Sequence, residues 1–81
     1  MNVTVHLFAR ARDLAGADRV SVELPAAATA GDLRRQLAVR IPALAALLPQ
    51  SALAVAGEFA ENDQPLSADA EIALLPPVSG G

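Results

Sequence analysis

The stretch TAGDLRRQLAVRIP, residues 29–42, decides the fold, because it has the pattern of an amphipathic helix placed between strand-like segments. Thr29 and Asp32 approximate a capping box, in which the two residues exchange side-chain and backbone hydrogen bonds at a helix start. Pro42 cannot continue a helix. A further helical turn is expected over residues 43–48. The apolar face of the main helix repeats every fourth residue, at Leu33, Leu37 and Ile41.

Segments that alternate apolar and polar residues lie on both sides of this helix, as is typical of half-buried strands. The first two join across a turn region at residues 13–18 and predict an antiparallel hairpin. A helix between strands predicts an α+β domain, in which the hairpin lies beside the last strand and one sheet face carries the helix. The predicted strands cover residues 2–10, 19–24, 52–56, 58–60 and 71–75.

The sequence ends with LLPPVSGG, residues 74–81. Pro76 and Pro77 lack a backbone donor, so the last strand must stop at residue 75. Gly80 and Gly81 carry no side chain, so they suit passage through a narrow channel with the Gly81 carboxylate at the tip. A frayed terminus without a role is the alternative. We therefore expect a domain over residues 1–75 and a flexible tail over residues 76–81.

Composition excludes several classes of function. Six arginines and nine acidic residues give a net charge of −3 without a run of like charge, which argues against nucleic acid and anionic membranes as partners. The chain has no lysine and no cysteine, so it offers no Schiff-base amine, disulfide or thiol chemistry. No apolar run approaches the roughly 18 residues that cross a bilayer. A cytoplasmic location is the expectation.

The side chains themselves offer little chemistry. His6, the single histidine, is predicted on an exposed strand face, where an ordinary surface role is the expected one. The acidic residues fall mostly at turns and do not follow the spacing of a metal-binding loop, so we predict no metal site. The glycines before the tail are isolated and form no phosphate-binding loop. An enzyme that acts alone is not predicted.

The two aromatic residues, Phe8 and Phe59, are more informative. The alternation places Phe8 and Leu75 on the sheet face away from the helix. Exposed apolar residues that are merely scattered need no explanation. The alternative is an apolar docking patch of Phe8, Phe59 and Leu75 beside the tail.

The order of elements and the tail closely resemble the small subunit of molybdopterin synthase, the MoaD family of ubiquitin-like β-grasp proteins. This resemblance implies a mixed sheet with one main helix packed on one face. The resemblance covers the whole chain, and its most specific part is the ending PPVSGG at residues 76–81. Two positions depart from the family pattern: the central turn has Ala56-Gly57 in place of Asn-Gly, and residues 68–71 lack a common glycine. The supporting segments are Leu7–Ala9, Arg12–Leu14, Gly16, Leu33-Arg34, Val55–Glu58 and Pro65-Leu66.

The resemblance implies a sulfur carrier. In that family the carboxylate of the last glycine, here Gly81, is adenylated by a partner enzyme that uses ATP and is then converted to a thiocarboxylate. The tail enters the synthase large subunit, which supplies the catalytic residues and passes the sulfur to a pyranopterin precursor of the molybdenum cofactor. No bound cofactor is expected, and the assembly is expected to be a heterotetramer. The implied partner contacts are Phe8, Phe59, Leu75, Pro76, Pro77, Val78 and Ser79, with Gly80 beside the reactive end.

The residues leave two other functions open. A carrier of the same kind could deliver sulfur to thiazole synthesis or to tRNA thiolation. A protein modifier would instead attach its terminal glycine to lysines of other proteins.

Overall fold

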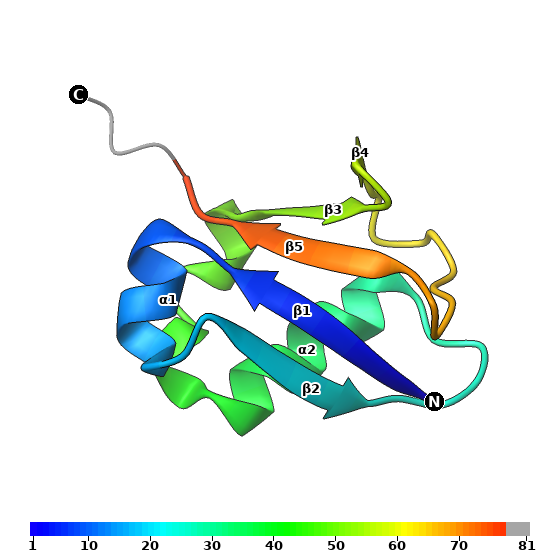
Figure 1. The fold of residues 1–81 in the computed structure, drawn as a ribbon, viewed down its shortest axis with the longest axis horizontal. Helices are drawn as coiled ribbons and strands as arrows, with labels where there is room; N and C mark the ends of the chain where they lie inside the picture. Colours follow the sequence, from blue (N-terminus) through cyan, green and yellow to red (C-terminus); the bar gives the residue numbers. More distant parts are fainter. Residues whose placement is uncertain (78–81) are drawn as a thin grey trace.

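The sheet contains five strands in the order β2-β1-β5-β3-β4 (Figure 1). They are seen in a computed structural model that describes residues 1–77. β1 pairs antiparallel with β2 and parallel with β5, and β3 pairs antiparallel with β5 and β4. The mixed sheet and the position of the hairpin beside the last strand are confirmed. The strands are β1 (Asn2–Leu7), β2 (Arg19–Glu23), β3 (Ala52–Val55), β4 (Glu58–Phe59) and β5 (Glu71–Leu75).

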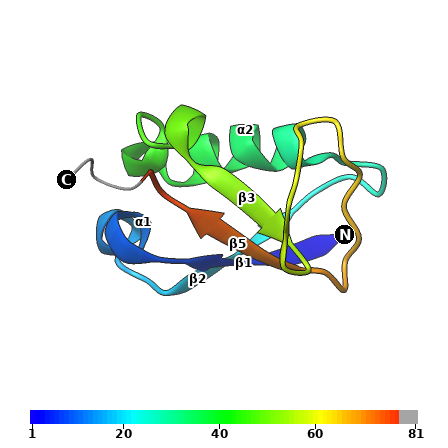
Figure 2. The ribbon, with the colours of Figure 1, turned by 90° about the horizontal axis from the view of Figure 1, so that it is seen from above.

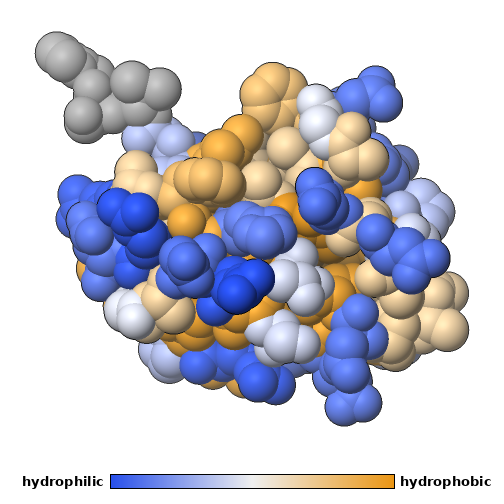
Figure 3. All heavy atoms as spheres, viewed as in Figure 1, coloured by the Kyte–Doolittle hydropathy of each residue, from blue (hydrophilic) through white to orange (hydrophobic). Residues whose placement is uncertain are grey.

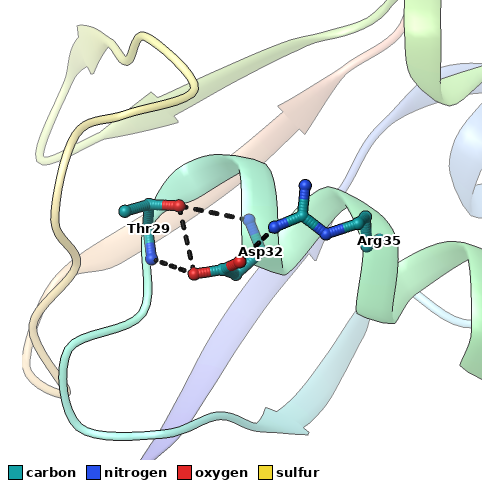
Figure 4. A network of polar contacts seen from close by, with 3 residues as sticks. All are labelled: Thr29, Asp32 and Arg35. Atoms are coloured by element: carbon teal, nitrogen blue, oxygen red, sulfur yellow. Dashed lines mark hydrogen bonds and ion pairs between the residues drawn. The ribbon is translucent and has the colours of Figure 1, made fainter.

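The main helix, α2 (Ala30–Arg40), begins at the predicted capping box (Figure 4). The Thr29 backbone N–H donates to Asp32 Oδ2 at 2.9 Å, and the Asp32 N–H donates to Thr29 Oγ1 at 3.3 Å. These two bonds satisfy backbone donors that the first helical turn leaves unpaired. The chain leaves the helix at Ile41, before Pro42, as predicted.

The loop before β5 completes the start of α2. The Ala30 and Gly31 N–H groups donate to the carbonyl oxygens of Gln64 and Asn62, at 2.9 and 2.8 Å. A Cβ atom at Gly31 would lie 3.1 Å from the Asn62 oxygen, so this close approach favours glycine. Leu66, in the same loop, is buried in the core. The loop is thereby fixed against the helix.

The hydrophobic core lies between α2 and one face of the sheet (Figure 2). Alternation along β1, β3 and β5 sends every second side chain into this core, as the sequence pattern predicted. The other face of the sheet carries no helix (Figure 2). The largest fully buried side chains are Val3, Val5, Leu7, Val22, Leu33, Leu37, Leu44, Leu53, Ile72 and Leu74.

The prediction for residues 8–15 was wrong. The first strand stops at Leu7, and the expected strand end and turn contain a second helix, α1 (Ala9–Ala15). Ala9 has a φ of 50°, which turns the chain sharply out of the sheet. Ala11 is fully buried, so packing of this helix across the end of the core favours it over a longer strand. α1 ends at Gly16, whose φ is 71°.

Two connections differ from or refine the expectations. The helical turn expected over residues 43–48 is replaced by two 3₁₀ turns, Pro42–Leu44 and Leu48–Gln50. A proline in each turn favours short 3₁₀ segments, while Leu44 and Leu48 pack into the core. The predicted turn at Ala56-Gly57 is present, with positive φ at both residues. This is the geometry of the tight two-residue hairpin turn.

Candidate functional site

A row of paired residues crosses the face of the sheet away from α2, with two alanines at its centre. Strand pairing places His6 beside Ala73, Ala73 beside Ala54, and Ala54 beside Phe59. Directly paired residues project to the same face, so this row crosses four strands. The two alanines leave a shallow hollow of about 380 Å³, which His6, Phe8, Ala54 and Ala73 line together. We call it the sheet-face hollow.

Two exposed aromatic rings flank this hollow. Phe8, 47% exposed, lies between β1 and α1, and Phe59, 76% exposed, lies on the short edge strand β4. Single exposed apolar side chains are common, but two aromatic rings on one sheet face beside a hollow are a candidate docking patch. The structure thus places both predicted aromatics on the face away from α2. Binding of a partner there remains a prediction.

A larger hollow of about 850 Å³ lies where the tail leaves the domain. We call it the tail-root hollow. Leu75 and Pro76 form one wall, Phe8 and Arg10 a second, and Leu47 and Gln50 a third. In Figure 3, hydrophobic side chains at the end of β5 adjoin hydrophilic ones over α1. Phe8 lines both hollows, so it separates the sheet face from the tail root.

A half-buried arginine fixes the loop that carries Leu47 and Gln50. Arg34 Nη1, on α2, donates to the carbonyl oxygens of Leu48 and Ser51, at 2.8 Å each. The Ser51 hydroxyl donates to the Leu47 carbonyl, also at 2.8 Å. Charge-assisted bonds of this kind are stronger than neutral ones. The loop that carries Leu47 and Gln50 is therefore fastened to the main helix.

Asp32, at the start of α2, has a shifted acidity. The Thr29 backbone N–H lowers the pKa of the Asp32 carboxyl below its ordinary value of 3.8; desolvation opposes this shift, and the Thr29 hydroxyl and Arg35 each lower the pKa further. The Arg35 guanidinium forms an ion pair with the same carboxylate (Figure 4). This carboxylate caps the helix and lines neither hollow. Its lowered pKa therefore reflects helix capping and gives no sign of a functional site.

Residues 1–77 contain no cluster of three or more histidine, cysteine, aspartate or glutamate side chains able to hold a metal ion. No helix in that part of the chain is long and apolar enough to cross a membrane. His6 is half-buried and lines the sheet-face hollow, so it is less exposed than expected.

The predicted tail residues fall in two groups. Pro76 is half-buried, Pro77 is exposed, and both line the tail-root hollow with Leu75. The other predicted site residues, Val78, Ser79, Gly80 and Gly81, lie outside the described residues.

The sequence analysis did not identify Arg10, Leu47 and Gln50, which line the tail-root hollow. Arg10 was assigned to a strand, because a seven-residue helix is too short to give a clear helical period. Leu47 and Gln50 reach the site only through the tertiary fold. The one available signal was Gly16, a typical helix end after the segment ARARDLA.

Known proteins share this fold. SAMP1 from Haloferax volcanii is 32% identical with a TM-score of 0.88, and each chain is covered completely. The complex of subunits 1 and 2 of the molybdopterin-converting factor from Helicobacter pylori contains a chain with a TM-score of 0.70 at 24% identity, again with complete coverage of both, which shows a common fold. The fold and the exposed sheet face define a small ubiquitin-like β-grasp protein.

Within this class the chain belongs to the ThiS family, whose model matches residues 5–81. A relative from Dictyostelium discoideum, described as a molybdopterin synthase sulfur carrier subunit, is 37% identical over 78 residues. That alignment covers 93% of this chain and 91% of the relative. The similarity therefore extends over the domain and is not confined to one motif.

Proposed function

We propose that this protein is the sulfur-carrier subunit of a molybdopterin synthase. The observation that carries the proposal is the combination of a β-grasp domain with a tail that ends in Gly80-Gly81 and leaves β5 at the largely apolar tail-root hollow. The full-length similarity to a relative described by that function supports it. The reaction needs a partner enzyme that consumes ATP, so we place the protein in the cytoplasm.

The chemistry starts at the Gly81 carboxylate, which is a poor electrophile because its charge is delocalised. A partner adenylating enzyme joins it to the phosphorus of AMP from ATP and releases pyrophosphate. Hydrosulfide, or an equivalent sulfur donor, then attacks the carbonyl carbon and expels AMP, which leaves a thiocarboxylate. No cofactor needs to reside on this chain for these steps.

Delivery requires a second partner, the synthase large subunit. The thiocarboxylate sulfur forms a bond to a side-chain carbon of the pyranopterin precursor, and an oxygen substituent leaves that carbon as water. A second water then hydrolyses the resulting thioester, which leaves the sulfur on the pterin and restores the Gly81 carboxylate. Two such rounds build the dithiolene. The large subunit supplies the catalytic side chains, and a heterotetramer of two copies of each subunit is the assembly we propose.

The composition of the tail suits this role. Ordering a flexible backbone costs about 1–2 kcal/mol per residue. Pro76 and Pro77 reduce the freedom of the free chain and so lower that cost. Glycines at the tip allow close approach in a narrow channel. Contacts of Phe8, Phe59 and Leu75 with the partner would supply the remaining binding free energy.

Protein modification is a second candidate, because structural relatives, including the one from Haloferax volcanii, are named small archaeal modifier protein 1. The activated Gly81 carbonyl would then be attacked by a lysine amine of another protein, forming an amide and releasing AMP. The two functions share the adenylate and differ in the nucleophile.

Intact mass spectrometry separates these functions. The protein is incubated with its adenylating enzyme, ATP and a sulfide source, with and without a lysine-rich acceptor protein. A carrier gains the mass difference between one sulfur and one oxygen atom, located at Gly81 by fragmentation. Attachment to acceptor lysines without that gain would favour the modifier, and no ATP-dependent change at all would contradict both.

A second assay separates the carrier functions. The thiocarboxylate form is offered to the synthase large subunit with pterin precursor, and in parallel to a thiazole synthase. We expect sulfur loss only in the first mixture. Loss only in the second would assign the carrier to thiazole synthesis.

A further inference from the structure

The tail-root hollow has a chemical character distinct from the sheet-face hollow. Its described walls are apolar apart from Gln50 and one charged side chain, Arg10. Phe8, Leu75 and Pro76 give the tail-root hollow an apolar lining, to which Arg10 adds a guanidinium. A guanidinium beside an apolar surface fits a ligand that presents a carboxylate next to an apolar group.

Arg10 is free to take such a partner. Its side chain is exposed, and the ion pair found within residues 1–77 joins Arg35 to Asp32, not Arg10 to a carboxylate. The guanidinium carries five N–H donors in a planar fork that matches both oxygens of a carboxylate. No acid of the described chain uses that fork.

Charge is unevenly distributed along the chain. Residues 1–40 contain all six arginines and four acidic residues, whereas residues 41–81 contain five acidic residues and no arginine or lysine. The loop between β4 and β5 lies at the opposite end of the molecule from residue 77 (Figure 1). An acidic partner surface is therefore repelled by that end of the molecule. The acids of the far end are Glu58, Glu61, Asp63, Asp69 and Glu71.

From these observations we infer that the tail-root hollow binds an acidic segment of the large subunit at the mouth of the channel that takes the tail. One carboxylate of that segment pairs with Arg10, and a neighbouring apolar side chain packs on Phe8 and Pro76. The inference rests on the proposed function and specifies how that partner is recognised. It gives Arg10 a positioning role, because the pair would set the direction in which the tail enters.

The test measures binding of the full chain to the synthase large subunit by calorimetry at low and moderate salt. Reversal of the Arg10 charge, Arg10→Glu, should weaken binding at least about tenfold, because like charges then face each other in a partly desolvated contact. Arg10→Lys should weaken it less, since the charge stays but the fork is lost. The salt dependence of binding should shrink in Arg10→Glu.

Arg40→Glu is the matched control. Arg40 is exposed in the last turn of α2, lines neither hollow, and gives the same change of net charge. We expect this variant to bind within about twofold of the wild type, because screened charges outside the contact have little effect. Circular dichroism confirms that each variant is folded.

The outcomes distinguish the inference from the proposed function. If Arg10→Glu binds as well as Arg40→Glu, the inference is overturned while sulfur delivery can stand. If the wild-type chain does not bind the large subunit, the proposed function and the inference are both overturned. Loss of binding in Arg10→Glu alone, with a reduced salt dependence, supports the inference.

Discussion

Ala56 holds a backbone conformation that alanine rarely adopts. Its φ is 53° and that of Gly57 is 84°, which together form the tight turn between β3 and β4. A side chain with a Cβ costs roughly 1–2 kcal/mol in this region, while asparagine tolerates it better. The turn that presents Phe59 is therefore strained at one residue.

Ala56→Asn should stabilise the protein by about 0.5–1 kcal/mol, because asparagine relieves that strain. Urea denaturation measures the change. Ala68→Asn serves as the control, since Ala68 is an exposed turn residue that is absent from the positive-φ residues. A loss of stability, or a gain equal to that of the control, would contradict the turn assignment.

Phe59→Asp should weaken binding to the large subunit by about tenfold or more, because central aromatic residues often dominate interfaces. The ring is 76% exposed, so the melting temperature should change little. Phe8→Asp should behave similarly. Val39→Asp is the matched control, because Val39 is 71% exposed on α2, across the sheet from the patch. Equal affinities of the Phe59 and Val39 variants would disprove the docking patch.

The start of α2 links stability to pH. The pKa of Asp32 is lowered in the folded protein, chiefly by the Thr29 backbone N–H, so the ionised form stabilises the fold. This contribution is fully present above the ordinary pKa of 3.8 and disappears as the pH falls through the lowered folded value. Protonation removes the charge that both the capping bond and Arg35 favour.

Asp32→Asn should therefore be less stable than the wild type at neutral pH, and the difference should shrink on acidification below about pH 4. Urea denaturation of both proteins across pH 7 to 2 gives the difference directly, because the other carboxylates contribute almost equally to each. A difference that stayed constant over this range would show that Asp32 does not act through its charge.

Elements with many residues in a regular pattern could be predicted from the sequence. The period of four between Leu33 and Leu37 and the capping box at Thr29 were sufficient for α2. α1 could not be predicted in this way, because it has seven residues and buries chiefly Ala11. Tertiary packing across the end of the core stabilises this helix more than its own sequence does.

Only part of the candidate site could be predicted from the sequence. Phe8 and Phe59 stood out as the two aromatics of a chain with few of them, and alternation put Phe8 on the correct face. The tail-root hollow combines side chains from α1, a 3₁₀ turn and the end of β5. Such a surface arises from contacts between distant segments, which a one-dimensional pattern does not encode.

At the scale of the whole molecule, the chain leaves the stable core before it reaches the proposed reactive end. The core includes Leu74 and the other inward residues of β5, while Leu75 is only half-buried and Pro77 is exposed. The last hydrogen-bonded strand residue precedes the prolines. A change at the final glycine should therefore alter chemistry without altering the fold.

Deletion of Gly81 tests this separation most directly. Thermal denaturation and ATP-dependent sulfur loading are measured side by side on the wild type and the shortened chain. We predict an unchanged melting temperature, within about 2 °C, together with complete loss of sulfur transfer. A large fall in melting temperature, or a shortened chain that still delivers sulfur, would contradict the account.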